Sequence, residues 1–555
     1  MREPPPQFDR IYTATNTGTS NHGWNAHAHG DARFTGFHFL QRIVMVKLFQ
    51  DPSISDQQTF FKSLTNDYIY ILFLALVGTI GFWITAHAWP FAPGRDFERY
   101  LTNTINVDGF NFGSNADGIL TNFLMSYLLD SSYTIVESFT ALGYFLSLFT
   151  MYYVGLIFGR TVARVASFIV LLNLQVPVFL HSICSDPFAF IGLHIWLIIV
   201  VRYYRINNIA SSIIIGCASF FLVTIRLPYQ LFIFSALIPI ICHRVSIRTL
   251  YNSLIIFMTF CLLWISYAWI NKTRHNTFSV NPYQIGYVLS YNIFYFNKSM
   301  SEKNGPHSAR LAELTREHLL SKPYYQDNAI TLESFFGSPQ KEFYSEMYLM
   351  AERFEPGIVN KAALETIMQH PKKFIRRFFQ LIEWGLRQPF KPDMSQCAEK
   401  SPESNQNKSA SSATRAPNYF TEENSQTIIP PDVLEKAHRI KEQRTLIFKE
   451  RKVACDTAQS IIKYNFNLFP SMLYFWILSA FILLFYKHIE IRLLFCFLTP
   501  CASVTILSFT TQSPWANYRM PFDGLFILSG IVGLLSILQF IALFVEKKSL
   551  QGTQS

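Results

Sequence analysis

The chain has 555 residues, of which half are apolar, 16% are aromatic and only 15% are charged. Soluble domains carry about 25% charged residues, so this composition excludes an ordinary soluble protein and predicts a polytopic membrane protein. The net charge of +10 is interpreted as basic loops on the cytoplasmic side of a membrane, and no nucleic-acid partner is expected.

Residues 1–67 predict a cytoplasmic N-terminal tail. The chain is polar up to Gln50 and carries Pro4-Pro5-Pro6 where a secretory signal would have an apolar core. The first apolar segment, which begins at Tyr68, is therefore expected to remain in the membrane as an anchor.

About ten apolar segments predict transmembrane helices. The short loops on one side of these segments each hold two Lys or Arg residues, and the short loops on the other side hold none or one. Positive residues favour the cytoplasmic side, so both termini are predicted to be cytoplasmic. The predicted spans cover residues 68–89, 133–158, 163–181, 187–202, 209–224, 228–243, 249–270, 468–486, 491–511 and 523–545.

The fold class expected is therefore an all-α polytopic membrane protein with a large, mainly helical, extracytoplasmic loop domain. Residues 546–555 form a cytoplasmic tail in this scheme. The expected domains are the transmembrane helices 1–7 at 68–270, which include a first outer loop at 91–132, the loop domain at 271–467, and the transmembrane helices 8–10 at 468–545.

The two outer segments have distinct features. Within the first outer loop, Gly118 to Leu129 is too short to cross a membrane and is expected to lie along its interface. In the loop domain, Lys372 to Phe379 mixes basic and apolar residues in the pattern of an interfacial helix. Cys397 and Cys455 both belong to this domain and could form a disulfide if it is extracytoplasmic.

Two carboxylates follow the first span directly. A carboxylate at the position of Asp96 or Glu98 could accept the proton of a hydroxyl group that attacks a sugar. The alternative is a solvated surface where both acids pair with Arg95 and Arg99. Asp186 stands in the second outer loop, before Pro187, and there the alternative is an N-terminal helix cap.

Arg226 and Arg519 lie on the predicted outer side, where the positive-inside rule disfavours arginine. A guanidinium has forked donors that suit phosphate oxygens. The alternative for each arginine is contact with lipid headgroups by snorkelling. Two outer arginines together with outer carboxylates favour a site that binds phosphate and activates a hydroxyl.

The chain resembles the polytopic GT-C glycosyltransferases, in particular the branch of protein O-mannosyltransferases and lipid A aminoarabinose transferases. The similarity extends from Tyr68 to Val545 as topology and short motifs. The motifs are Arg95-Asp96-Phe97-Glu98-Arg99-Tyr100, Ser185-Asp186-Pro187, Arg226-Leu227-Pro228, His370-Pro371-Lys372-Lys373-Phe374 and Tyr518-Arg519-Met520-Pro521.

The resemblance implies an inverting transfer of a sugar from a polyprenyl-phosphate donor on the extracytoplasmic face. It implies that Asp96 is the general base, that Arg226 and Arg519 hold the lipid phosphate with Tyr518 beside them, and that Asp186 shapes the pocket. The family has an Asp-Glu doublet where this chain has Asp96-Phe97-Glu98, so either acid could be the base.

Several alternatives remain open from the sequence. The acceptor could be a lipid, a glycan or a protein, and a divalent cation could take part, although no metal ligands are identified. The second hypothesis is a transporter or flippase of a lipid-linked glycan, and the third is a non-catalytic scaffold. The expected location is the bacterial inner membrane, or the endoplasmic reticulum in a eukaryotic host, with membrane lipids as partners.

Overall fold

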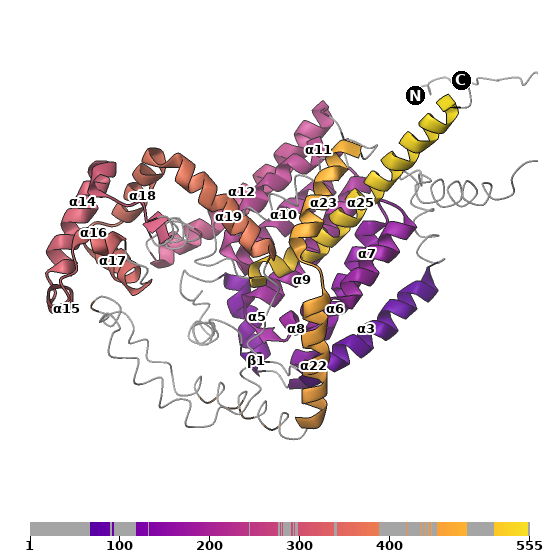
Figure 1. The fold of residues 1–555 in the computed structure, drawn as a ribbon, viewed down its shortest axis with the longest axis horizontal. Coiled ribbons are helices and arrows are strands. Elements are labelled where there is room, and N and C mark those ends of the chain that lie inside the picture. Colours follow the sequence, from indigo (N-terminus) through magenta and orange to yellow (C-terminus); the bar gives the residue numbers. More distant parts are fainter. Residues whose placement is uncertain are drawn as a thin grey trace, which may run out of the picture. The chain divides into compact units, whose positions relative to one another are not determined.

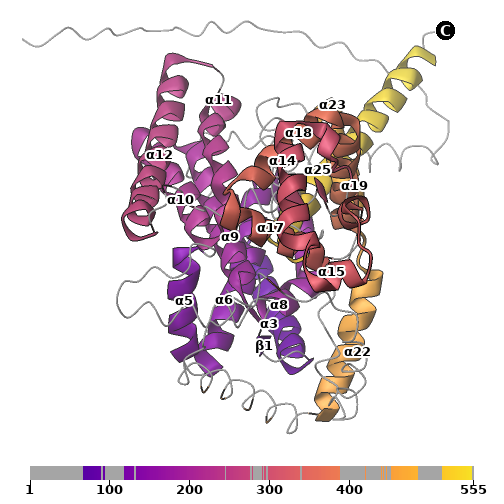
Figure 2. The same cartoon turned by 90° about the vertical axis from the view of Figure 1, so that its left-hand side faces the viewer.

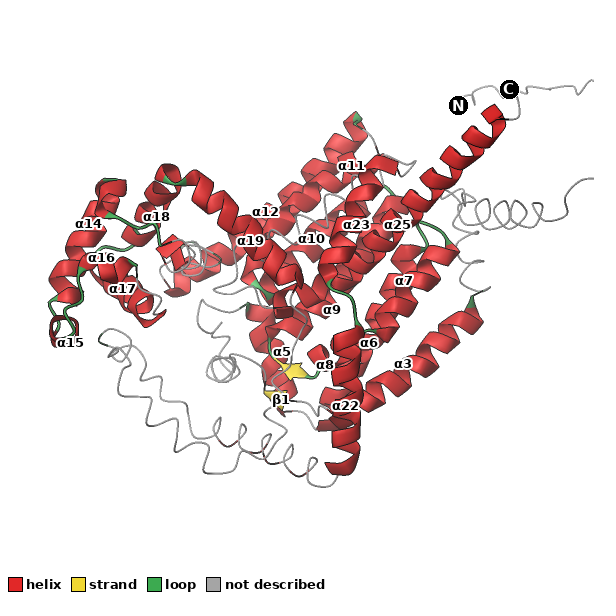
Figure 3. Cartoon of the chain, in the orientation of Figure 1, coloured by secondary structure: helices red, strands yellow, loops and turns green. Residues whose placement is uncertain are grey.

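The computed structural model describes residues 67–88, 92–93, 118–130, 133–275 except Arg244, 452–485 and 516–552. It also describes most of 298–387 and a few separate residues between 278 and 294 and between 419 and 446. These parts are almost entirely helical (Figures 1 and 3). Strand structure in them is confined to the two-residue segments β1 (Ala92–Pro93) and β2 (Ser182–Ile183), which pair in parallel with Pro93 opposite Ile183.

The first half of the chain folds into a series of apolar helices. Their long apolar runs and scarce Gly and Pro favour helices, which satisfy every interior backbone hydrogen bond within one segment. The elements are α3 (Tyr68–Ala88), α5 (Ile119–Asp130), α6 (Tyr133–Gly155), α7 (Arg160–Leu172), α8 (Gln175–Leu180), α9 (Ser185–Arg205), α10 (Ile209–Ile225), the 3-10 helix η2 (Leu227–Leu237), α11 (Ile238–His243) and α12 (Ile247–His275).

The last part of the chain adds one amphipathic helix and two apolar helices to this group. These are α22 (Lys452–Leu468), α23 (Met472–Phe485) and α25 (Ala516–Gly552). Helix α23 packs along α25, as Figures 1 and 2 both show, and α25 also packs against α7 and α9. Helix α22 packs against α3, so segments from opposite ends of the sequence are neighbours.

Five described helices are long and apolar enough to cross a membrane. They cover Tyr68–His87, Ile135–Gly155, Ser185–Tyr204, Ile247–Thr273 and Arg519–Ala542. Each of them falls on a span that the sequence predicts. The coarse prediction of a helical membrane protein is therefore supported, whereas ten crossings and their directions stay predictions.

Other predicted spans differ from the helices that form. The segment 163–181 is divided into α7 and α8 at Asn173, whose Oδ1 accepts from Gln175 N at 3.2 Å. Asn465 of α22 also bonds the backbone at this break: its amide donates to Leu172 O at 2.8 Å and its oxygen accepts from Leu174 N at 3.1 Å. The segment 228–243 forms η2 and α11. Pro239 at their junction lacks a backbone donor, which disfavours one continuous helix.

Two further predicted spans form helices that are shorter than the five long ones. Helix α10 has 17 residues, which span about 26 Å, somewhat less than the hydrocarbon core of a bilayer. Helix α23 has 14 residues and reaches spanning length only together with α22, at a bend of 41°. The predicted span 491–511 and the predicted Cys397–Cys455 disulfide lie outside the described residues, since Cys397 is among those not described.

One end of α3 is attached to the turn between α6 and α7 by a buried charge. The Asp67 carboxylate accepts from Tyr152 Oη and Arg164 Nη2, and Arg160 Nε lies 3.8 Å from it. Tyr70 adds a hydrogen bond to Arg164 O at 2.6 Å. The start of α3 therefore lies beside the end of α6, as expected for antiparallel helices.

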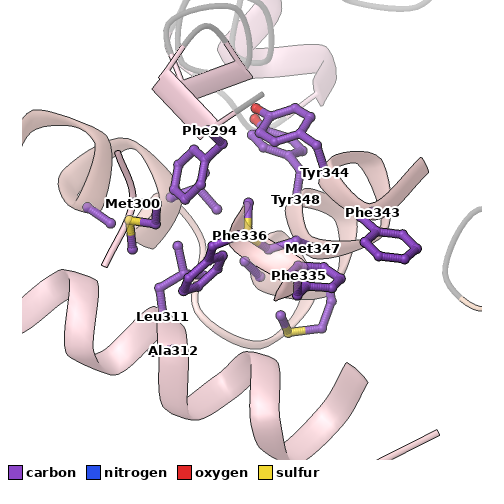
Figure 4. Packing of buried hydrophobic residues seen from close by; sticks show 14 of the residues in the cluster. Phe294, Met300, Leu311, Ala312, Phe335, Phe336, Phe343, Tyr344, Met347 and Tyr348 are labelled. Atoms are coloured by element: carbon purple, nitrogen blue, oxygen red, sulfur yellow. The ribbon is translucent and has the colours of Figure 1, made fainter. Parts of the chain in front are cut away.

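The helices between residues 302 and 387 pack around a hydrophobic core of their own (Figure 4). Its aromatic members stack closely, as in the parallel pair Phe335 and Phe343, with ring centroids 5.0 Å apart. The elements of this region are η4 (Glu302–Asn304), α14 (Pro306–Leu314), the π-helix η5 (Thr315–Leu320), α15 (Pro323–Asp327), α16 (Leu332–Phe336), α17 (Lys341–Phe354), α18 (Ile358–Gln369) and α19 (Pro371–Arg387). We call them the loop helices.

Candidate functional site

Asp186 lies in the first turn of α9 and is almost fully buried. The N-cap position of this helix is Cys184, which has an extended backbone and caps nothing with its side chain. Asp186 is therefore not the N-cap residue, which was the simple alternative for it. Its carboxylate forms an ion pair with Nη1 of Arg226, and its charge also lies where it stabilises a helix N-terminus.

Arg226 stands at the junction between two helices. The backbone becomes extended at this residue, which ends α10, and Pro228 then occupies the first turn of η2. The Arg226 side chain is 15% exposed and that of Asp186 is 8% exposed, so this is a largely buried pair. Removing one partner from such a pair leaves the other charge uncompensated.

The start of α5 packs against the end of α10, directly before Arg226. Thr121 Oγ1 donates a hydrogen bond to Ile225 O at 2.7 Å. Gly118 has no side chain at a point where a Cβ atom would collide with the carbonyl oxygens of Thr224 and Ile225. The position therefore requires glycine for the close approach of the two backbones.

The described residues on both sides of the segment 94–117 lie near the ion pair. β1 precedes this segment and pairs with β2, three residues before Asp186. Gly118 follows the segment and lies against the carbonyl groups next to Arg226. The segment 94–117, which contains Asp96 and Glu98, therefore begins and ends beside residues that neighbour Asp186 and Arg226.

Tyr229 is a buried phenol beside this ion pair. Its side chain is 2% exposed and its hydroxyl has no hydrogen-bond partner in the part of the chain that the structure describes. The charges of Arg226 and Asp186 both act on it. Its ring meets Phe522 of α25 edge-on, with centroids 6.3 Å apart. An unbonded buried hydroxyl is costly, which makes this atom a candidate ligand contact.

Arg519 forms a second buried ion pair at the start of α25. Its Nε donates to Asp523 Oδ1 at 2.7 Å and its Nη2 donates to Asp523 Oδ2 at 3.2 Å. Its Nη1 donates to Gly385 O at 2.9 Å, at the end of α19. Because all three nitrogens are bonded within the protein, Arg519 connects α25 to the loop helices.

The structure brings two of the residues that the sequence singles out, Asp186 and Arg226, into direct contact. Arg519 forms a separate ion pair, and the ring contact of Tyr229 with Phe522 links the turn of α25 that follows Arg519 to the residues beside Arg226. Tyr518 directly precedes Arg519 in α25, but only its backbone is described. Asp96 and Glu98 lie outside the described residues, so their predicted roles are neither supported nor opposed by contacts.

Sequence reasoning missed Asp523 and Tyr229. Asp523 could have been found, because a carboxylate four residues after Arg519 in an apolar helix faces the same side and needs a partner. Tyr229 has no such signal, since its position beside the ion pair depends on how α9, η2 and α25 pack.

The site contains one thiol, that of Cys184, whose Sγ lies 3.7 Å from Asp186 Oδ2. Burial and the neighbouring carboxylate raise the pKa of Cys184, which disfavours the thiolate form. Among the described residues, no group of three or more His, Cys, Asp or Glu side chains is arranged to hold a metal ion.

No protein-family model, curated protein or solved structure matches the chain. The interpretation of the site therefore rests on its geometry and chemistry.

Proposed function

We propose that the chain is an integral-membrane glycosyltransferase. It moves a sugar from a polyprenyl-phosphate donor to an acceptor on the extracytoplasmic face, with inversion at the anomeric carbon. The observation that supports this proposal is the Asp186–Arg226 ion pair beside the unpartnered Tyr229 hydroxyl, where both ends of the Asp96-bearing loop are attached. A cation for phosphate and a carboxylate base would then share one site.

The length of the chain supports the inclusion of Asp96. A polypeptide extends at most about 3.6 Å per residue, so the Cα of Asp96 lies within about 11 Å of that of Pro93. Pro93 pairs with Ile183, which is close in sequence to Asp186. A base on this segment would therefore be within reach of a donor held at Arg226.

The arginines have different roles in this proposal. Arg226 would bind the donor phosphate through its forked guanidinium, which the ion pair with Asp186 holds at the site. Arg519 is the other predicted phosphate ligand, but such a contact would require it to leave Asp523 and Gly385. We therefore assign Arg519 a positioning role and keep Tyr518, its neighbour, as a predicted donor contact.

The proposed reaction is a single displacement. Asp96, or Glu98 in its place, takes the proton of the acceptor hydroxyl while the hydroxyl oxygen attacks the anomeric carbon. The bond between that carbon and the phosphate oxygen breaks, and polyprenyl phosphate leaves with the electron pair. Arg226 stabilises the negative charge that develops on the leaving phosphate.

The test uses the full chain in proteoliposomes with a panel of short-chain polyprenyl-phosphate sugars. Mass spectrometry would measure the release of free polyprenyl phosphate. If Asp96 is the base, Asp96→Asn is expected to lower turnover about 10²- to 10⁴-fold without loss of folding. If Glu98 is the base, Glu98→Gln is expected to have this effect instead.

Arg226→Ala is expected to raise the donor KM. The double variant Asp186→Ala/Arg226→Ala shows whether the unpaired charge of Asp186 contributes to the change in KM.

Arg310→Ala is the matched control, because Arg310 is an exposed arginine of the loop helices that pairs with Glu313 and Glu355. It is expected to leave turnover unchanged. Full turnover in both Asp96→Asn and Glu98→Gln would remove these acids from the site. Movement of intact donor across the bilayer without turnover would contradict the proposal and support the transporter alternative.

A further inference from the structure

Helix α19 carries an excess of positive charge. It has five basic residues and one acidic residue, Glu383, which pairs with Arg387 at 2.8 Å. Lys372, Lys373 and Arg376 are exposed, and no ion-pair partner for them exists in the described parts of the chain. The first half of α19 therefore presents three uncompensated cations.

The same half exposes two large apolar side chains. Ile375 is 54% exposed and Phe379 is 61% exposed, and residues four apart lie on one face of a helix. Phe374 packs against the core of the loop helices, and Leu381 is buried farther along. The described chain therefore covers only one edge of the apolar face of α19 and leaves Ile375 and Phe379 exposed.

The other end of α19 is held at the start of two apolar helices. Its carbonyl groups accept from Arg519, where the membrane-length stretch of α25 begins, and from Ser471 Oγ at 3.0 Å, directly before α23. The end of α19 therefore lies at the level where α25 would enter a bilayer.

We propose that α19 is a docking surface for an anionic lipid bilayer. The phosphate headgroups would pair with Lys372, Lys373 and Arg376, while Ile375 and Phe379 insert between them. Basic residues flanking exposed apolar ones, on a helix attached at the membrane boundary, have the chemistry of such a surface. A protein partner would cover the apolar edge without explaining three cations at this level. The proposal is independent of the transfer activity proposed above.

The experiment places a benzophenone side chain at residue 379 of the full chain. The protein is reconstituted in nanodiscs of phosphatidylcholine alone or with phosphatidylglycerol, irradiated and analysed by mass spectrometry. Phospholipid adducts are expected at residue 379, with a yield at least severalfold higher in the anionic nanodiscs. Benzophenone at Gln326, an exposed residue of α15 elsewhere on the loop helices, is expected to give few adducts.

Two matched pairs of charge changes complete the test. Lys372→Gln/Lys373→Gln is expected to reduce the yield in anionic nanodiscs, since each basic residue near an anionic surface changes binding roughly fivefold. Lys303→Gln/Lys361→Gln removes two exposed charges elsewhere on the loop helices and is expected to change nothing. Adducts with a second copy of the chain, equal yields in both lipids, or equal effects of the two double variants would overturn the proposal.

Discussion

Tyr229 is the residue where stability and the proposed function make opposite demands. A buried hydroxyl without a partner costs about 1–3 kcal/mol of folding free energy, and a ligand that bonds to the Tyr229 hydroxyl would recover this cost. By contrast, the hydroxyl of Tyr152 donates to Asp67 and stabilises the fold. The two hydroxyl groups therefore have opposite effects on the folding free energy: that of Tyr229 destabilises the fold and that of Tyr152 stabilises it.

We expect Tyr229→Phe to keep or raise the melting temperature of the full chain while it lowers donor turnover at least tenfold. Tyr152→Phe should lower the melting temperature, because it leaves the buried Asp67 carboxylate without one of its donors. Thermal unfolding by tryptophan fluorescence and the release of polyprenyl phosphate provide the two measurements. A Tyr229→Phe variant with normal turnover would show that the hydroxyl has no role in the site.

Arg519 and Asp523 form the most buried ion pair that involves a predicted site residue. We expect Arg519→Met alone or Asp523→Leu alone to destabilise the full chain by about 3–5 kcal/mol, because each leaves a buried charge unpaired. The double variant should be clearly more stable than either single variant. Chemical unfolding of all four proteins in detergent measures this coupling, and additive losses would argue against a mutually dependent pair.

At the scale of elements, the N-terminus of α14 is capped by a side chain from α18. Glu365 accepts from the amides of His307 at 3.0 Å and Ser308 at 2.7 Å. Gly305 allows this approach, since a Cβ there would collide with the carboxylate. Burial acts to raise the pKa of Glu365, but these hydrogen bonds outweigh it, so the pKa lies below its ordinary value.

A lowered pKa means that the ionised carboxylate stabilises the fold. This contribution is complete above the ordinary pKa of glutamate and is lost as the pH falls through the lower pKa of the folded state. We expect α14 to lose amide protection on acidification below pH ~4.5. In Glu365→Gln, hydrogen exchange should show reduced protection at neutral pH and a weaker pH dependence. The same pH dependence in both proteins would assign the acid sensitivity to other groups.

At the scale of the whole molecule, the contacts assign polar groups to two ends of the helices. Asp67 and Arg164 meet at the start of α3, and the ion pair of Asp186 and Arg226 lies near β1, which follows the end of α3. The 21 residues of α3 separate these ends by about 31 Å, the thickness of a hydrocarbon core. Such a separation suits a protein with one charged cluster at each membrane surface.

This arrangement predicts which residues a membrane-impermeant maleimide reaches. Cysteine introduced by Lys303→Cys, in the loop helices, should react from the extracytoplasmic side of intact cells. Cysteine introduced by Ile247→Cys, exposed at the start of α12, should react only after permeabilisation. The reverse pattern would place the loop helices in the cytoplasm and contradict the proposed location of the transfer site.

The helical, apolar character of the chain was predictable because it follows from composition and run length. The breaks in the helices have local signals in Pro239 and Asn173, whose side chain bonds the backbone of Gln175. The contact that Asn465 makes at the second break, from nearly 300 residues away, has no such signal. Propensity and hydropathy describe neighbours in sequence and cannot predict that contact.

For the candidate site, the sequence by itself determined which charges are unusual: it singled out Asp186, Arg226 and Arg519 because charges beside apolar segments are expensive. Only the tertiary structure decided their partners. Packing turned Arg226 toward Asp186 and Arg519 toward Asp523 and the end of α19, and it left the Tyr229 hydroxyl without a partner among the described residues. The physical reason is that each charged residue has its own cost of burial, whereas the partner that offsets this cost depends on which helices pack together.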